Sequence, residues 1–104
     1  MFCFQCQETA QNKGCTVKGV CGKTNDVANM QDLLVYLLKG ISKISVRLRE
    51  KGEESPEVNR FVMNSLFMTI TNANFDKQRF EKQVKECSIQ IHSCFPNLYR
   101  LANV

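Results

Sequence analysis

Apolar residues recur at helical spacing through most of the chain after residue 25. In the first such stretch they step alternately by three and four positions, the heptad pattern of a helix with one buried face. These positions are Val27, Met30, Leu34, Leu37, Ile41, Ile44 and Leu48. Thr24 or Asn25 can cap the start of the helix, and Gly52 can end it. The pattern predicts a long amphipathic helix over residues 26–51.

A second helix is predicted from a start signal followed by a dense apolar segment. Ser55 suits the N-cap, Pro56 the first helical position and Glu57 the first turn. The apolar residues that follow cover nearly the whole circumference, so this helix needs burial on more than one side. They are Val58, Phe61, Val62, Met63, Leu66, Phe67, Met68 and Ile70.

A third apolar seam follows a polar break at residues 71–74 and ends near Phe95 and Pro96. Its positions are Phe80, Val84, Cys87, Ile91 and Cys94. No strand hairpin or internal repeat competes with this pattern, and a chain of 104 residues supports a single core. The sequence therefore predicts an all-α fold, with a cysteine-rich N-terminal loop at residues 1–25 and a three-helix bundle at residues 26–104, together forming one compact domain.

The N-terminal loop holds four of the six cysteines, with the spacing Cys3-x2-Cys6-x8-Cys15-x5-Cys21. Four thiolates that converge form a soft ligand set for an iron–sulfur cluster or for zinc. Zinc ligands usually come as two short C-x2–4-C pairs, and only Cys3 and Cys6 form one here. The spacing favours an iron–sulfur cluster, while a structural zinc site and redox-sensing thiols remain alternatives.

The residues around these cysteines favour an anionic centre. The helix expected to begin near Asn25 directs the positive end of its dipole toward Cys21. Further positive charge comes from Lys13, Lys18 and Lys23. Glycine N–H groups in the loop can donate hydrogen bonds to sulfur. Two aromatic residues are expected to exclude water from one face of the centre, namely Phe2 and Phe4.

Composition narrows the possible partners and locations. The formal net charge is +4, and the basic residues are interspersed without aromatic neighbours, so nucleic-acid binding is not expected. The longest apolar stretch, residues 33–38, is far too short to span a membrane. Because Met1 stands directly before Phe2 and Cys3, no export signal is expected to precede the cysteines. We therefore expect a reducing cytoplasm, where disulfides are disfavoured.

The remaining cysteines fall on the apolar seam of the third predicted helix. Cys87 and Cys94 lie seven positions apart, which is too far along one helix for a disulfide. Both are expected to act as small buried apolar side chains. His92 lies one step from the seam, and we expect it at the surface or in a hydrogen bond rather than on a metal.

Several segments also carry recognisable motifs. Residues 2–9 read FCFQCQET, residues 14–23 read GCTVKGVCGK and residues 27–34 read VANMQDLL. These segments resemble the N-terminus of the hybrid cluster proteins, the prismane or hydroxylamine reductase family. Residues 69–76, TITNANFD, resemble a later segment of the same N-terminal helical domain. The resemblance covers most of this chain but only a minor part of that family's length.

The resemblance implies that a 4Fe-4S cluster is ligated by Cys3, Cys6, Cys15 and Cys21. In that family the cluster passes electrons toward a separate hybrid cluster, where hydroxylamine or nitric oxide is reduced. The ligands of the hybrid cluster lie in later domains and have no counterpart here, so we expect no catalytic residue in this chain. The sequence is interpreted as an electron-transfer protein, with a subunit or fragment of a hydroxylamine reductase as the alternative.

The wide apolar surface of the second predicted helix leads to an expectation about partners. A lone three-helix bundle cannot cover all of it, so chains are expected to associate. We expect a homo-oligomer, with a dimer favoured, or association with a redox-enzyme partner.

Overall fold

The computed structural model describes residues 1–71 and 75–94, with the backbone alone at the last two positions. In chain order it contains a short 3-10 helix, η1 (Ala10–Asn12), and the α-helices α1 (Asn25–Glu50), α2 (Pro56–Met68) and α3 (Lys77–Cys94). No strand occurs within these described ranges. The predicted all-α three-helix architecture is confirmed. The predicted end of the third helix near Phe95 and Pro96 lies outside the described residues.

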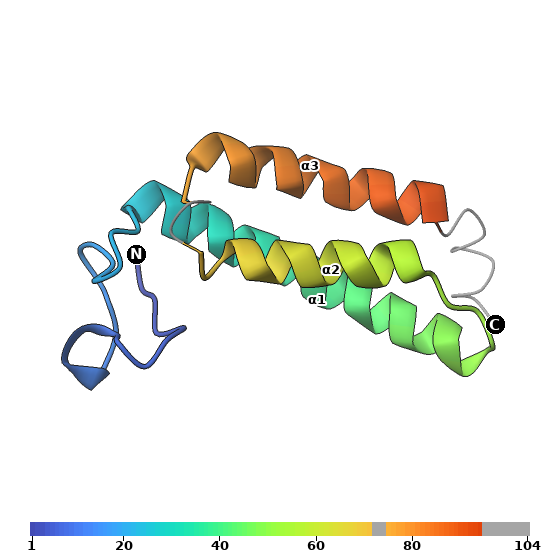
Figure 1. Cartoon of the computed structure of the whole chain (residues 1–104), viewed down its shortest axis with the longest axis horizontal. Coiled ribbons are helices and arrows are strands. Elements are labelled where there is room, and N and C mark those ends of the chain that lie inside the picture. Colours follow the sequence, from blue (N-terminus) through green and yellow to red (C-terminus); the bar gives the residue numbers. More distant parts are fainter. Residues whose placement is uncertain (72–74, 95–104) are drawn as a thin grey trace.

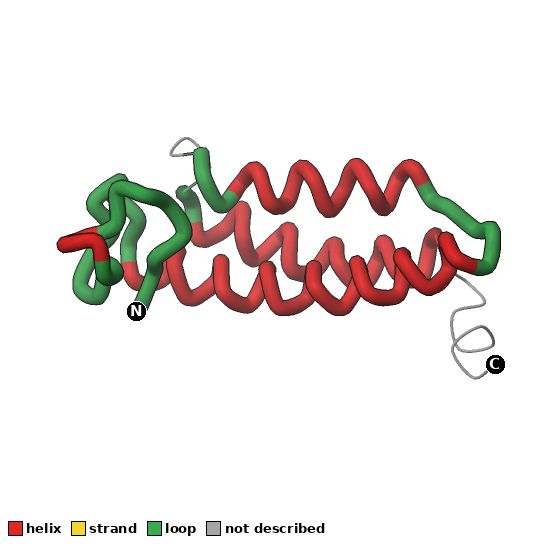
Figure 2. Tube along the Cα trace, turned by 90° about the horizontal axis from the view of Figure 1, so that it is seen from below, coloured by secondary structure: helices red, strands yellow, loops and turns green. Residues whose placement is uncertain are grey.

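The three helices run side by side, and the N-terminal loop sits at one end of the bundle (Figure 1). At that end α1 begins, α2 finishes and α3 begins, so neighbours in sequence run antiparallel. Figure 2 shows the same arrangement from a direction at right angles to the first. Each helix contacts the other two. The loop therefore meets the start of α1 and the connection between α2 and α3.

Local signals in the sequence set the starts of α1 and α2. The Thr24 hydroxyl accepts a hydrogen bond from the Val27 N–H at 3.4 Å. The Ser55 hydroxyl accepts one from the Val58 N–H at 3.4 Å, and Pro56 occupies the first turn. These bonds satisfy N–H groups that would otherwise lack a partner in the first turn. Helix α1 thus begins one residue before the predicted position 26.

The C-terminus of α1 is closed by a left-handed residue. Gly52 has a φ of +86°. Its N–H donates to the Arg49 carbonyl at 3.0 Å, and the Glu53 N–H donates to the Leu48 carbonyl at 2.9 Å. This pair of bonds is the Schellman motif, which favours glycine at the left-handed position. The predicted stop at Gly52 therefore has a specific conformational cause.

The core lies between the three helices. Its fully buried apolar residues are Val27, Leu34, Leu38, Ile41, Leu48, Val58, Phe80 and Cys87. All seven predicted seam positions of α1 lie in or against this core, with Met30, Leu37 and Ile44 partly buried. The buried face also extends to Gln31, Leu38 and Ser45. Two of these three are polar, so a hydrophobic pattern does not register them, and contact with two helices widens the buried face of α1.

Helix α2 leaves much of its apolar surface uncovered. Only Val58 and Ser65 are fully buried on this helix. Large side chains at its C-terminal half and just beyond remain exposed, namely Met63, Leu66, Phe67 and Ile70. None of the described helices is long and apolar enough to cross a membrane.

Candidate metal centre

The N-terminal loop is closed by a main-chain pair between two of its cysteines. The Cys3 N–H donates to the Cys15 carbonyl at 2.9 Å, and the Cys15 N–H donates to the Cys3 carbonyl at 2.8 Å. The Thr9 hydroxyl donates to the Cys3 carbonyl at 2.9 Å. Between them, η1 reverses the chain direction, with a left-handed Gln11 and Asn12. The backbone therefore fixes Cys3 beside Cys15.

The second half of the loop is a tight turn around Cys21. The Gly19 N–H donates to the Lys23 carbonyl at 2.8 Å, and the Gly22 N–H donates to the Gly19 carbonyl at 2.9 Å. Gly22 has a φ of +94°, which a side chain would strain. A Cβ on Gly19 would lie 3.1 Å from the Cys21 sulfur and 2.9 Å from the Lys23 Cβ. Only glycine leaves this space free beside the thiol.

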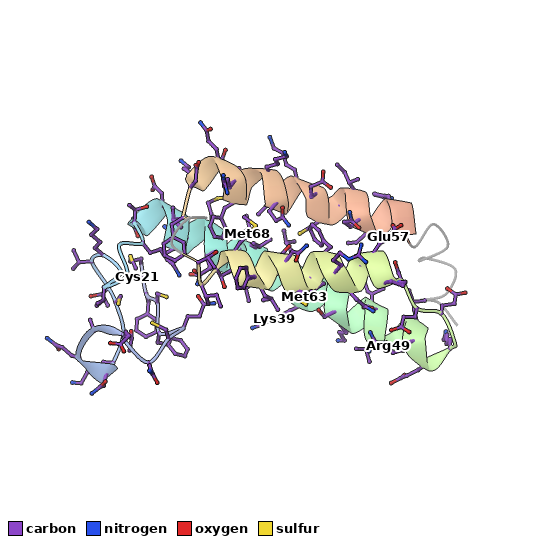
Figure 3. The ribbon with its side chains drawn as sticks, in the orientation of Figure 1. Cys21, Lys39, Arg49, Glu57, Met63 and Met68 are labelled. Atoms are coloured by element: carbon purple, nitrogen blue, oxygen red, sulfur yellow. The ribbon has the colours of Figure 1, made fainter. Side chains whose placement is uncertain are left out.

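All four cysteines of the loop line one pocket at the end of the bundle. The loop contributes Cys3, Cys6, Cys15 and Cys21, together with Gln5, Glu8, Thr9, Gly19, Val20 and Lys23. The opposite wall comes from the connection between α2 and α3, through Thr69, Ile70 and Phe75. Figure 3 labels Cys21 on the loop at this end. The four predicted ligand residues are thus brought together, and each is a free thiol.

The four thiols differ in exposure. Cys15 is buried, Cys3 is half-buried, and Cys6 and Cys21 are exposed. The centre of the pocket is therefore shielded on the Cys15 side by the loop itself. On the Cys6 and Cys21 side it stays open to an approaching molecule.

The environment of Cys15 favours its thiolate form. The backbone N–H of Val20 is the main cause that holds the pKa of Cys15 below its usual value, followed by the N–H of Ala10 and the Thr9 hydroxyl. The Ala10 nitrogen lies 3.4 Å and the Thr9 hydroxyl 3.7 Å from the sulfur. Burial opposes these effects, and the charge of Lys23 adds to them. A thiolate is the form that binds metal, so Cys15 is prepared to act as a ligand.

Lys23 is buried at the junction of the loop, α1 and the α2–α3 connection. Its side chain is only 2% exposed. The ammonium donates to the Thr69 carbonyl at 3.1 Å and to the side-chain carbonyls of Gln5 and Gln31. It also lies 3.9 Å from the Cys3 sulfur. A single side chain therefore ties the cysteine loop to two parts of the bundle.

The chemistry of the pocket fits a thiolate-bound inorganic cluster. Soft thiol ligands line it, backbone N–H groups point at the sulfur of Cys15, and Gly19 keeps room beside Cys21. Within residues 1–71 and 75–94, no three Cys, His, Asp or Glu side chains are arranged to hold one metal ion. The thiols stand around the pocket wall rather than at one point. Their role as ligands stays a prediction.

The structure corrects two expectations about the surroundings. Phe2 and Phe4 are 52% and 68% exposed and pack on each other with ring centres 5.3 Å apart, and neither lines the pocket. The apolar wall is formed instead by Ile70 and Phe75. The N–H groups at the Cys15 sulfur come from Val20 and Ala10 rather than from glycines. Sequence spacing gave no signal for these distant or non-glycine contacts.

Cys87 and His92, which the sequence predicts not to bind metal, do not line the pocket. Cys87 is buried in the core, and burial is the main cause that raises the pKa of its thiol. His92 is exposed on the last turn of α3. The side chain of Cys94 lies outside what the structure describes. Cys87 therefore behaves as the small buried side chain that the α3 seam predicts.

Fold and site together define a small helical domain with a four-cysteine pocket at one end. Residues 1–93 match the Prismane/CO dehydrogenase family, to which the chain therefore belongs. It is 58% identical to the hydroxylamine reductase of Parabacteroides distasonis over 97% of this chain and 18% of that protein. It is 64% identical to that of Halothermothrix orenii over 83% of this chain and 16% of that protein.

A third relative also extends far beyond the length that this chain covers. The hydroxylamine reductase of Bacteroides thetaiotaomicron is 48% identical over 99% of this chain and 19% of that protein. The chain thus spans less than a fifth of each of these three relatives. The predicted resemblance to an N-terminal domain of the hybrid cluster protein family is confirmed.

Proposed function

We propose that this chain binds a 4Fe-4S cluster in the loop pocket and exchanges single electrons through it. The ligands in this proposal are Cys3, Cys6, Cys15 and Cys21. The observation that carries it is that four thiols from one segment line one pocket. When bound, such a cluster supplies a one-electron redox centre.

The residues of this chain have separate tasks in the proposal. Val20, Ala10 and Thr9 stabilise the Cys15 thiolate by hydrogen bonding, which favours ligation at neutral pH. Ile70 and Phe75 cover one side of the pocket with apolar surface, and this limits water access. The exposed thiols, Cys6 and Cys21, mark the side on which a redox partner approaches.

The proposal assigns electron transfer rather than catalysis to this chain. Four cysteine ligands satisfy all four irons of such a cluster, so no iron position is left for a substrate. The pocket also lacks a paired acid and base within the described residues: its only acidic side chain is the exposed Glu8. A reducing cytoplasm is the proposed location, because the centre requires free thiols.

A second candidate follows from the relatives. The chain is similar to one part of proteins named hydroxylamine reductase, so we also propose a role as the electron-delivering part of such an enzyme. Hydroxylamine reduction measured with and without the remaining length of a relative separates the two roles. Hydroxylamine reduction that requires both this chain and the remaining length of the relative supports a role as part of an enzyme. Electron exchange without hydroxylamine reduction supports a role as an independent electron carrier.

Metal analysis tests the central proposal. After purification without oxygen, about four iron and four sulfide per chain are expected, together with visible absorbance that dithionite bleaches. Zinc is measured in the same sample, because a structural zinc site also uses four thiolates. One zinc without sulfide would replace the cluster proposal with the structural alternative. Thiols without metal would favour a redox-sensing module.

A further inference from the structure

The ammonium of Lys23 is a buried charge whose described partners are all neutral. It contacts carbonyl oxygens of Thr69, Gln31 and Gln5, and it lies 4.8 Å from the centre of the Phe75 ring. Across the part of the chain that the structure describes, no carboxylate lies within ion-pairing distance of it. A buried charge is costly unless an opposite charge compensates it. The position therefore calls for a nearby anion.

The geometry places the cysteine pocket where that anion is needed. Lys23 itself lines the pocket, and its ammonium lies 3.9 Å from the Cys3 sulfur. Its nearest lysine neighbours in the loop do not share this environment, because Lys13 and Lys18 are exposed. Solvent screens exposed charges strongly, whereas a buried charge acts on its neighbour with less screening. Of these three lysines, only Lys23 is placed to act strongly.

We propose that Lys23 is a positioning residue that serves as the fixed counter-charge of the four-thiolate centre and couples it to the helical bundle. This inference rests on the proposed function. A positive charge beside an anionic centre favours the more negative, reduced form, so Lys23 raises the midpoint potential. The same attraction holds the loop against α1 and Thr69 when the centre is loaded.

A purely structural role for Lys23 predicts different results. Its hydrogen bonds to Gln31 and Thr69 tie loop and bundle together with or without a cluster. If those bonds were its only purpose, removing the ammonium would destabilise the loaded and metal-free chains equally. It would also leave the midpoint potential close to that of the unaltered protein.

The first measurement is the midpoint potential of the loaded protein, followed by redox titration. Lys23→Met removes the charge and keeps an unbranched side chain, and Lys18→Met removes an exposed charge from the same loop as a control. We expect Lys23→Met to shift the ratio of oxidised to reduced centres at fixed potential at least tenfold toward oxidised, which corresponds to about 59 mV for one electron. A shift no larger than that of Lys18→Met overturns the proposal.

The second measurement is the gain in unfolding temperature on cluster loading. Hydrogen bonds that Lys23→Met loses in both the loaded and the metal-free form cancel in this gain. The gain is therefore expected to be smaller than in the unaltered chain because the attraction between the ammonium and the centre is lost. An equal gain contradicts the coupling. If Lys23→Met takes up no cluster, the helix content of its metal-free form distinguishes the two roles of Lys23. Unchanged helix content supports the inference, whereas lost helix content assigns Lys23 a structural role. An unaltered chain without iron and sulfide removes the proposed function and this inference together.

Discussion

Cys3 and Cys15 are joined through their backbones by two reciprocal hydrogen bonds, of 2.9 and 2.8 Å. The bonds involve only main-chain atoms, so they do not depend on either sulfur. A substitution of the thiol group therefore leaves this closure of the loop in place. Ligand function and loop geometry can be separated by mutation at these positions.

Replacing Cys15 tests the ligand assignment directly. Cys15→Ser is expected to lose most of its iron and sulfide, because a hydroxyl is a poor substitute for a thiolate on iron. Helix content by circular dichroism should stay near that of the unaltered protein. Cys87→Ala is the matched control, since Cys87 lies in the core away from the pocket. Full iron content in Cys15→Ser would refute the proposed ligand set.

The helix stop of α1 offers a paired stability test. Gly52 needs its left-handed conformation, so Gly52→Ala is expected to lower the free energy of unfolding by about 1 kcal/mol. Gly40 lies within α1, where an added Cβ meets no atom. Gly40→Ala should raise the free energy of unfolding by roughly 0.5–1 kcal/mol. Denaturant unfolding measures both, and changes of the same sign would contradict the assigned cap.

The exposed apolar surface of α2 is expected to bring two chains together. Phe67 is 59% exposed and Met63, labelled on α2 in Figure 3, is 64% exposed. We predict a dimer at micromolar concentration by sedimentation and expect Phe67→Lys to weaken it at least tenfold. Ile89→Lys changes an exposed residue of α3 and serves as the control. A stable monomer of the unaltered protein would disprove this prediction.

The core thiol of Cys87 gives a prediction about pH. Burial, with the neighbouring Glu86 charge, raises the pKa of Cys87 in the folded chain. The unfolded chain then loses the proton first, so this contribution to stability is complete below the ordinary thiol pKa of about 8.5 and is lost as pH rises toward the folded pKa. The free energy of unfolding, measured across that pH range, should fall less steeply in Cys87→Ala than in the unaltered protein. Parallel curves would contradict the assignment.

Helix boundaries followed from the sequence because their causes are local. Thr24, Ser55 and Gly52 act within a few residues of themselves, and each performs the predicted role. The register of the α1 core was harder to predict, since Gln31 and Ser45 are buried although polar. Burial at these positions depends on which helices pack against α1. That information is absent from the periodicity of one segment.

The candidate site was predictable in its cysteines but not in its walls. The spacing of Cys3, Cys6, Cys15 and Cys21 indicated one centre, and the structure places all four at one pocket. Thr69 and Phe75 reach that pocket only because α2 returns to the loop end of the bundle. Charge alone could not distinguish Lys23 from the other lysines of the loop, because burial arises from tertiary packing.

The pocket draws its thiols from residues 3–21 and its far wall from Thr69, Ile70 and Phe75. Changes in that wall alter polarity and water access around the sulfur atoms without removing any ligand. Under the proposed function, chains with identical cysteine spacing can therefore differ in midpoint potential through substitutions at Thr69, Ile70 or Phe75, far downstream of Cys21. Comparing relatives by their cysteine motif alone would overlook this source of diversity.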